Sequence, residues 1–268
     1  MLADLAAEAG TCLLDLHGDE DHHRSVLTLA GPPATLEEAV HRLVSTAVER
    51  LDLRAHQGAH PRSGVVDVVP FVPLGGGCPL PRAADLAPAV AARDRFANWA
   101  TAALGLPCVL YGPLPTGEVR TLPEARRMMR GTVGHPTAGV TAVGARPVLV
   151  AYNVWLDTDD LALAERMARE IRGPTLRALG FRLGSKVQVS CNLIDPWRLG
   201  PGQAHDEIAA RLRGTGTSVV RAELVGLLPR DVLHAIDGDR WESLGLAESS
   251  TIESRLDGRG LVGAVNPG

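Results

Sequence analysis

The order of apolar patterns between residues 146 and 227 limits the possible folds more than any other feature of the chain. β-Branched and alternating runs predict strands at 146–156, 178–183, 187–195 and 218–227. Amphipathic runs predict helices at 158–171 and 203–213. In chain order these elements read β-α-β-β-α-β, which is the split βαβ arrangement, an open sheet with helices packed on one face.

The first half predicts the same order without its opening strand. Strands are expected at 12–17, 25–30, 65–74 and 107–111, and helices at 1–9, 35–51, 83–104 and 121–131. We therefore predict an α+β protein of two ferredoxin-like (βαββαβ) subdomains packed side by side, residues 1–140 and 141–268. The strand missing from the first subdomain would be central in its sheet. Either the natural start lies upstream of Met1, or another strand takes that place.

Composition excludes several classes of protein. The chain has 268 residues, of which 45% are hydrophobic, and its net charge is −4. These values are typical of a globular protein and give no overall attraction to nucleic acid or anionic lipid. The apolar runs are shorter than the roughly 18 residues of a membrane span, and the four cysteines lack C-x-x-C spacing. We expect a cytoplasmic protein without nucleic-acid or membrane partners.

The loop R-A-H-Q-G-A-H-P-R-S-G, residues 54–64, is a candidate for chemistry because it joins a predicted helix to a predicted strand. Pro61 favours an extended backbone at His60. A histidine held in this way can donate or accept a proton, since its ordinary pKa of about 6.5 lies near working pH. The alternative is a solvated loop histidine that hydrogen-bonds the backbone.

Two charged segments have competing interpretations. The turn H-G-D-E-D-H-H, residues 17–23, carries donors suited to zinc or manganese. A charged β-turn whose aspartates cap backbone groups is the favoured interpretation, because no helical H-x-x-x-H fixes a metal geometry. Residues 120–130 carry four arginines. They form either a solvated helix face or a binding surface for carboxylates, to which the planar guanidinium is well matched.

Small residues dominate the segment 134–146, G-H-P-T-A-G-V-T-A-V-G-A-R, between the two predicted halves. Such residues let a flat ligand reach main-chain groups, and junctions between subdomains are favoured places for binding pockets. The alternative is a plain crossover loop. The signatures of phosphate-binding and dinucleotide-binding loops are absent from the sequence.

Several ordered motifs together resemble one family. The run L-D-L-R-A-H-Q-G-A-H-P-R-S-G-V-V-D-V-V-P-F-V-P-L is similar to the signature of the glutamate formiminotransferase domain, which reads like G-E-H-P-R-x-G-A-x-D-V-x-P-F-x-P. The similarity continues through V-L-Y-G (109–112), R-T-L-P (120–123), T-A-V-G-A-R-P-V-L-V-A-Y-N-V (141–154), Q-V-S-C-N-L-I-D (188–195) and E-L-V-G-L-L-P (223–229). It covers nearly the whole chain in the right order.

The resemblance implies transfer of the formimidoyl group from N-formimino-L-glutamate to tetrahydrofolate, a co-substrate, in histidine degradation and one-carbon metabolism. It also implies two ferredoxin-like subdomains with the folate between them, a homodimer and no metal. His60 takes the role of catalytic acid/base. The substrate-binding candidates are Arg62, Arg146, His17 and Arg120. The residues expected to contact folate are His135, Pro136, Thr137, Ala138, Gly139, Val140, Thr141, Ala142, Val143 and Gly144.

The chemistry agrees with a histidine between two nitrogens. When folate N5 attacks the formimidoyl carbon, the attacking nitrogen must lose a proton and the departing glutamate nitrogen must gain one. A single imidazole can make both transfers, an effect worth roughly 10² to 10⁴ in rate.

Three features differ from the family pattern. A V-P-N-F-S-E-G-like opening strand has no counterpart before Met1, the connection before His135 is short, and His17 stands where the long enzymes have an aspartate. A folate- or pterin-binding protein with lost or altered transfer chemistry is therefore the main alternative, and a metal-dependent enzyme using residues 17–23 is the third.

Overall fold

The computed structural model describes residues 2–58, 62–74, 80 and 85–259. The strands are β1 (Leu13–Asp19), β2 (Arg24–Leu29), β3 (Val68–Phe71), β4 (Cys108–Pro113), β5 (Val119–Arg120), β6 (Thr141–Ala145), β7 (Val150–Leu156), β8 (Leu176–Leu183), β9 (Lys186–Leu193) and β10 (Val219–Val225). The α-helices are α1 (Leu2–Ala9), α2 (Pro33–Arg50), α3 (Ala87–Leu104), α4 (Leu122–Met129), α5 (Leu161–Ile171), α6 (Pro201–Leu212), α7 (Arg230–His234) and α8 (Ile252–Asp257). The strands form several separate sheets with helices packed against them, so the mixed α+β class is confirmed.

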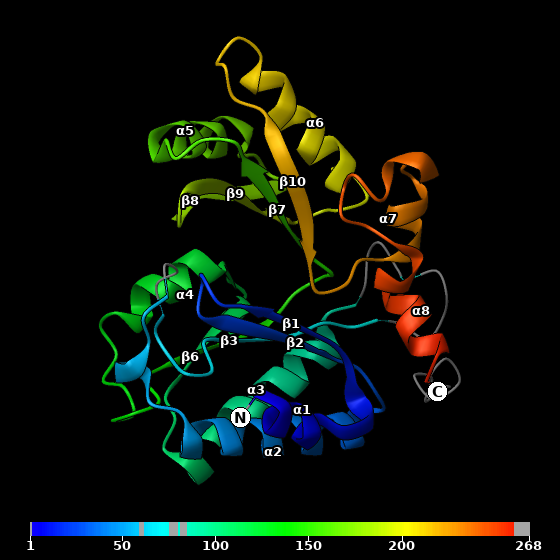
Figure 1. The fold of residues 1–268 in the computed structure, drawn as a ribbon. Helices are drawn as coiled ribbons and strands as arrows, with labels where there is room; N and C mark the ends of the chain where they lie inside the picture. Colours follow the sequence, from blue (N-terminus) through cyan, green and yellow to red (C-terminus); the bar gives the residue numbers. More distant parts are fainter. Residues whose placement is uncertain (1, 59–61, 75–79, 81–84, 260–268) are drawn as a thin grey trace.

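The second half forms an antiparallel sheet with the strand order β10-β7-β9-β8. Its chain order, β7-α5-β8-β9-α6-β10, is the one that the sequence predicts. Helices α5 and α6 lie over one face of this sheet (Figure 1). Every second residue of β7, from Val150 to Leu156, is buried in the core that the sheet shares with these helices. The alternation of side chains along a strand therefore assigns one face of the sheet to the core.

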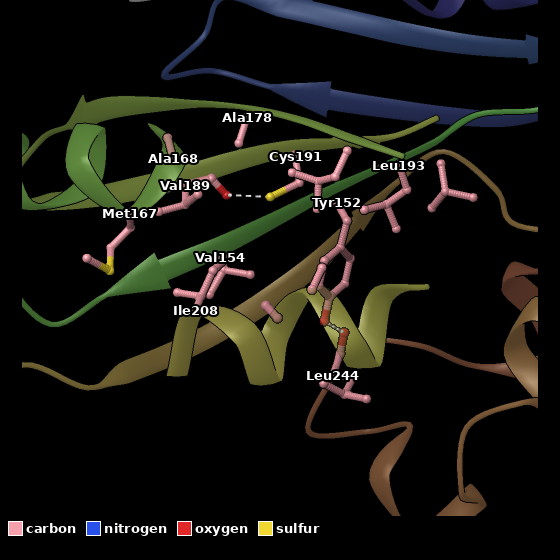
Figure 2. Packing of buried hydrophobic residues seen from close by; sticks show 14 of the residues in the cluster. Tyr152, Val154, Met167, Ala168, Ala178, Val189, Cys191, Leu193, Ile208 and Leu244 are labelled. Carbon is pink, nitrogen blue, oxygen red and sulfur yellow. Dashed lines mark hydrogen bonds between the residues drawn. The ribbon is translucent and has the colours of Figure 1, made fainter. Parts of the chain in front are cut away.

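Aliphatic side chains fill this core, and Figure 2 shows how they surround Tyr152 of β7. The Tyr152 hydroxyl donates a hydrogen bond to the Leu244 carbonyl at 2.8 Å, which satisfies its polar end. Cys191 of β9 lies in the same core, and burial raises the pKa of its thiol to about 12. The thiol is therefore protonated at neutral pH and unsuited to nucleophilic chemistry.

The other face of the same sheet carries polar side chains. Asn153, Gln188 and Glu223 stand at the alternate positions of three neighbouring strands, on the side away from α5 and α6. Asn153 is directly opposite Glu223 in the pairing of β7 with β10. The hairpin of β1 and β2 lies beside this face (Figure 1), so the polar residues are enclosed between the sheet and the first half of the chain.

The first half departs from the predicted arrangement. Its four-stranded sheet has the order β3-β6-β4-β5, and β6 runs parallel to both of its neighbours in a central position. The sequence pattern does not predict β6 or β5. The expected strands at 12–17 and 25–30 are present as β1 and β2, but they pair only with each other in a separate hairpin.

Helices cover both faces of this sheet, in contrast to the expected single face. The core on one side contains Phe96 of α3 and Val143 of β6. The core on the other side contains Ala125 of α4 and Ala142 of β6. Because both faces are covered, β6 can consist of small buried residues without the alternation that marks a half-exposed strand. Within the described ranges, the helices do not have the length and apolar character that crossing a membrane requires.

Candidate functional site between the two halves

His60 lies outside the described residues, in the gap between Gly58 and Arg62. The residues before it are held against the turn of the β1–β2 hairpin. The rings of His23 and His56 are stacked with centroids 5.1 Å apart, and the backbone N–H of Gln57 donates to His23 Nδ1 at 3.2 Å. A Cβ on Gly58 would lie 2.1 Å from the His22 carbonyl oxygen, so a glycine is needed for this close approach.

On the other side of the gap, Arg62 faces an ion pair of Asp67 with Arg126. The Arg126 Nη2 donates to Asp67 Oδ2 at 2.6 Å, and Arg62 Nη1 lies 4.0 Å from the same oxygen. The backbone N–H of Ser63 donates to Asp67 Oδ1 at 3.1 Å. Only 7% of the Asp67 side chain is exposed. A carboxylate this deeply buried is tolerable because cationic and backbone donors surround it.

Arg24, the first residue of β2, joins this group from the hairpin. Burial lowers the pKa of Arg24, while the negative charges of Asp19, Glu223 and Asp67 oppose that shift. The charge of Arg126 lowers the pKa of Arg24 further. Arg24 therefore lies among carboxylates from the hairpin, the 62–67 segment and the second half of the chain.

The hairpin turn is tied to the sheet of the second half through His22, which is fully buried. Its Nε2 lies 3.1 Å from Gln188 Oε1, and its ring meets Phe181 of β8 edge-on. Gln188 Nε2 in turn donates to Glu223 Oε1 at 3.3 Å, and Asn153 Nδ2 donates to the same oxygen at 3.0 Å. A continuous set of hydrogen bonds thus runs from the hairpin turn to β9, β7 and β10.

We use the term "polar site" for the residues that these interactions bring together. Its members are Asp19, His22, Arg24, Arg62, Asp67, Arg126, Asn153, Gln188 and Glu223. Arg62 of this set was singled out from the sequence as a substrate-binding candidate, Arg126 belongs to the arginine run 120–130, and Asp19 and His22 belong to the charged turn 17–23. The signal for the others was a polar residue at alternate positions of an otherwise apolar strand, as at Gln188 and Glu223. That pattern marks a strand whose second face is not part of the core.

The remaining candidate arginines have structural contacts. Arg120 Nη1 donates to the Leu110 carbonyl at 2.9 Å and so ties β5 to β4. Arg146 Nη1 donates to the carbonyl of the adjacent Pro147. Burial lowers the pKa of Arg146, and the neighbouring Tyr111 hydroxyl opposes that shift.

His17 is half-buried on β1, directly opposite Val26. It belongs to the segment 17–23, in which the Asp19 carboxylate accepts the backbone N–H of His22 at 2.8 Å. This bond is a turn cap of the kind expected for a charged β-turn. Over the part of the chain that the structure describes, histidine, cysteine and acidic side chains do not gather in threes with metal-binding geometry.

The segment from His135 to Gly144 lies against the 62–67 segment. His135 Nδ1 accepts the backbone N–H of Ala138 at 3.0 Å and closes a tight turn. Beyond the turn, Val140 N–H donates to the Ser63 carbonyl, and Ala142 N–H donates to the Asp67 carbonyl. The folate-contact candidates therefore support the backbone that positions Asp67, next to the polar site.

The arrangement suits recognition of anions by hydrogen bonding. Guanidinium groups present planar pairs of donors that match the two oxygens of a carboxylate. The amide and carboxylate groups of Gln188, Asn153 and Glu223 add donors and acceptors on the opposite wall. The described residues of the polar site are therefore suited to bind and orient an anion, and the described residues just before and after the gap at His60 lie against them.

Comparison with known proteins adds independent information. A family model described as "Formiminotransferase domain, N-terminal subdomain" matches residues 2–146. A "Glutamate formimidoyltransferase" of Streptococcus pyogenes serotype M1 is 33% identical over 263 residues, which covers 87% of this chain and 84% of the relative. A protein of the same name from Thermoplasma acidophilum is 27% identical over 273 residues, which covers 91% of this chain and 87% of that relative. The "Formimidoyltransferase-cyclodeaminase" of Sus scrofa is 28% identical over 85% of this chain but only 47% of its own length.

Proposed function

We propose that this chain, which belongs to the formiminotransferase family, transfers the formimidoyl group of N-formimino-L-glutamate to tetrahydrofolate. The observation that carries the proposal is the extent of the match to the streptococcal glutamate formimidoyltransferase, which spans most of both chains. The protein is then a transferase of histidine degradation with tetrahydrofolate as its co-substrate. We place it in the cytoplasm as a homodimer.

In this proposal His60 is the catalytic acid/base. It would take the proton that folate N5 loses on attack and return a proton to the departing glutamate nitrogen. Its role rests on the motif A-H-P-R, residues 59–62, within the matched region. The packing of Gly58 and Gln57 against the hairpin turn supports the role, because it fixes the backbone just before the motif against a turn that contributes to the polar site.

The proposed binding residues divide by ligand. Arg62 binds a substrate carboxylate, for which its position in the polar site is well suited. Arg146, His17 and Arg120 remain proposed substrate contacts of lower rank, since the arginines also bond to backbone carbonyls. The segment 135–144 is the proposed wall for the folate.

The finer description of the fold is also part of the proposal. We describe residues 141–268 as a ferredoxin-like subdomain, supported by the chain order βαββαβ and the spatial order β10-β7-β9-β8. Residues 1–140 would form a variant of the same subdomain, in which a strand from the junction, β6, lies in the centre of the sheet. Because β6 pairs with strands of the first sheet, the segment 141–145 would belong to the first subdomain, and the proposed boundary at 140/141 would move to the end of β6.

A spectrophotometric assay with formiminoglutamate and tetrahydrofolate tests the function. We expect turnover by the wild-type protein and a loss of roughly 10² to 10⁴ in rate for His60→Ala. His205→Ala is the matched control, because His205 lies on α6 beside Asp206 and outside the polar site. If the wild-type protein shows no turnover but still binds reduced folate in calorimetry, the transferase proposal is wrong and the protein is a folate-binding protein instead.

A further inference from the structure

Two guanidinium nitrogens of the polar site are buried without a hydrogen-bond partner among the described residues. They are Arg24 Nε and Arg62 Nη2. A buried charged donor without an acceptor carries a desolvation penalty that no hydrogen bond offsets. Such donors persist in a folded protein where a ligand or water completes them, so each one marks a place at which an acceptor is missing.

The carboxylates nearby already have other partners. Asp67 Oδ2 lies 2.6 Å from Arg126 Nη2 but 4.0 Å from Arg62 Nη1. Asp67 Oδ1 accepts the backbone N–H of Ser63. The Asp67 carboxylate therefore forms a hydrogen-bonded ion pair with Arg126, and it lies too far from Arg62 Nη1 for a hydrogen bond.

The two carboxylates whose charges act most strongly on Arg24, those of Asp19 and Glu223, also accept hydrogen bonds from other groups. Glu223 Oε1 accepts bonds from Asn153 and Gln188, and its Oε2 lies 3.4 Å from Arg221 Nη2. Asp19 Oδ1 accepts the backbone N–H of His22. Both carboxylates offset the charge of Arg24 from a distance, and neither receives a hydrogen bond from its Nε.

Electrostatics adds to the shortage of acceptors. Burial lowers the pKa of Arg62, and the positive charges of Arg24 and Arg126 lower it further, against the opposing charge of Asp67. Three guanidinium groups thus share one partly buried space and repel one another. An additional negative charge between Arg24 and Arg62 would relieve this repulsion and supply the two missing acceptors together.

We propose that Arg24 and Arg62 together bind a carboxylate of the substrates, which makes Arg24 a substrate-binding residue of this enzyme. The inference rests on the proposed function. A carboxylate has two oxygens, one for Arg24 Nε and one for Arg62 Nη2, and it is the only anionic group that formiminoglutamate and tetrahydrofolate share. It comes either from the donor amino acid or from the glutamate tail of the folate.

Steady-state kinetics of Arg24→Gln and Arg24→Lys distinguish these two sources. If the donor carboxylate binds here, Arg24→Gln raises the KM for formiminoglutamate by roughly tenfold to a hundredfold, the range for a hydrogen bond to a charged group. If the folate tail binds here, the KM rises for tetrahydrofolate but not for tetrahydropteroate, which lacks the glutamate. Arg24→Lys keeps the charge without the planar donors and should lie between wild type and Arg24→Gln.

Arg182→Gln is the matched control, because Arg182 stands beside the turn of another hairpin, bonds the Asp159 carbonyl and is about half exposed. Melting curves establish whether each variant is folded. If Arg24→Gln does not fold, the same kinetic measurements are made on Arg62→Gln. Unchanged KM values for all three substrates in a folded Arg24→Gln protein would overturn the inference.

Calorimetry with glutarate, a dicarboxylate without a transferable group, separates this inference from the proposed function. Binding that is weakened in Arg24→Gln and Arg62→Gln but kept in Arg182→Gln supports the carboxylate site even if no turnover is found. Equal affinity in all variants contradicts it even if the enzyme is active.

Discussion

Gly144, in the middle of β6, faces the ring of Tyr111 on the neighbouring strand β4. A Cβ at position 144 would lie 2.0 Å from the Tyr111 Cζ atom, and only 4% of Tyr111 is exposed. Tyr111 also belongs to the buried cluster that contains Ala125 and Met129 of α4, so other side chains already pack around it. The small residue that the sequence suggested as a contact for folate therefore also has a packing role.

We expect Gly144→Ala to destabilise the protein by about 1–3 kcal/mol, the usual cost of overfilling a packed core. Urea unfolding measures the change. Gly173→Ala is the control, because a Cβ there meets no atom within 4 Å, and its effect should stay within about 0.5 kcal/mol. A Gly144→Ala protein of normal stability but weakened folate binding would show instead that position 144 acts through the ligand.

At the scale of elements, the sequence predicted those that carry a long run of amphipathic, alternating or β-branched residues. The helices α2 and α5 follow from amphipathic runs, and the four strands of the second half follow from alternating or β-branched runs. The strand β6 does not, because Thr-Ala-Val-Gly-Ala is buried on both faces and contains residues of low strand propensity. The polar site escaped prediction for another reason, since Arg24, Asp67 and Gln188 are brought together by contacts between distant segments that local patterns do not encode.

The contact of the β1–β2 hairpin with β9 depends on the pair of His22 and Gln188. Both side chains are fully buried, and their polar atoms lie 3.1 Å apart. We expect His22→Ala to leave Gln188 Oε1 without this partner and to cost about 1–3 kcal/mol. A double-mutant cycle with Gln188→Ala should give a coupling of about 1 kcal/mol. A coupling near zero would mean that the hydrogen bond between His22 and Gln188 does not help to hold the hairpin against β9.

Glu248 lies between α7 and α8 in the sequence, and its side chain is bonded to two residues of α7. Its carboxylate accepts a hydrogen bond from His234 Nε2 at 2.7 Å and another from Arg230 Nε at 2.8 Å. These two partners, His234 first, hold the pKa of Glu248 below its usual 4.5. A carboxyl group whose pKa is lowered by folding adds stability above its unfolded pKa, and this contribution is lost as the pH falls through the lower folded value.

We therefore expect Glu248→Gln to be less stable than wild type by about 0.5 kcal/mol at pH 7, a small value because the pair is partly exposed. The difference should shrink as the pH falls below 4.5. Urea midpoints at a series of pH values measure it, with the exposed Glu242→Gln as control. A difference that grows on acidification would exclude the carboxylate as its source.

At the scale of the whole molecule, stability is distributed unevenly around the polar site. The inner strands β7 and β9 are paired on both sides and contribute fully buried side chains to the core of the second half. The hairpin β1–β2 has pairing on one side only, and Leu16 at its surface is 38% exposed. One wall of the proposed substrate site is thus formed by β7 and β9, which are paired on both sides. The other wall is formed by the β1–β2 hairpin, which is held to the rest of the chain by side-chain contacts.

Amide hydrogen exchange followed by mass spectrometry should reveal this difference. We expect the amides of β7 and β9 to exchange at least about tenfold more slowly than those of β1 and β2, since local opening is easiest where pairing and burial are least. Saturating tetrahydrofolate or glutarate should slow exchange in the hairpin, because a ligand bound only by the folded site stabilises every element that forms it. Hairpin amides as protected as β9 without ligand would place β1 and β2 in the same cooperative unit as the sheet. In that case substrate would bind to a preformed site rather than tighten one of its walls.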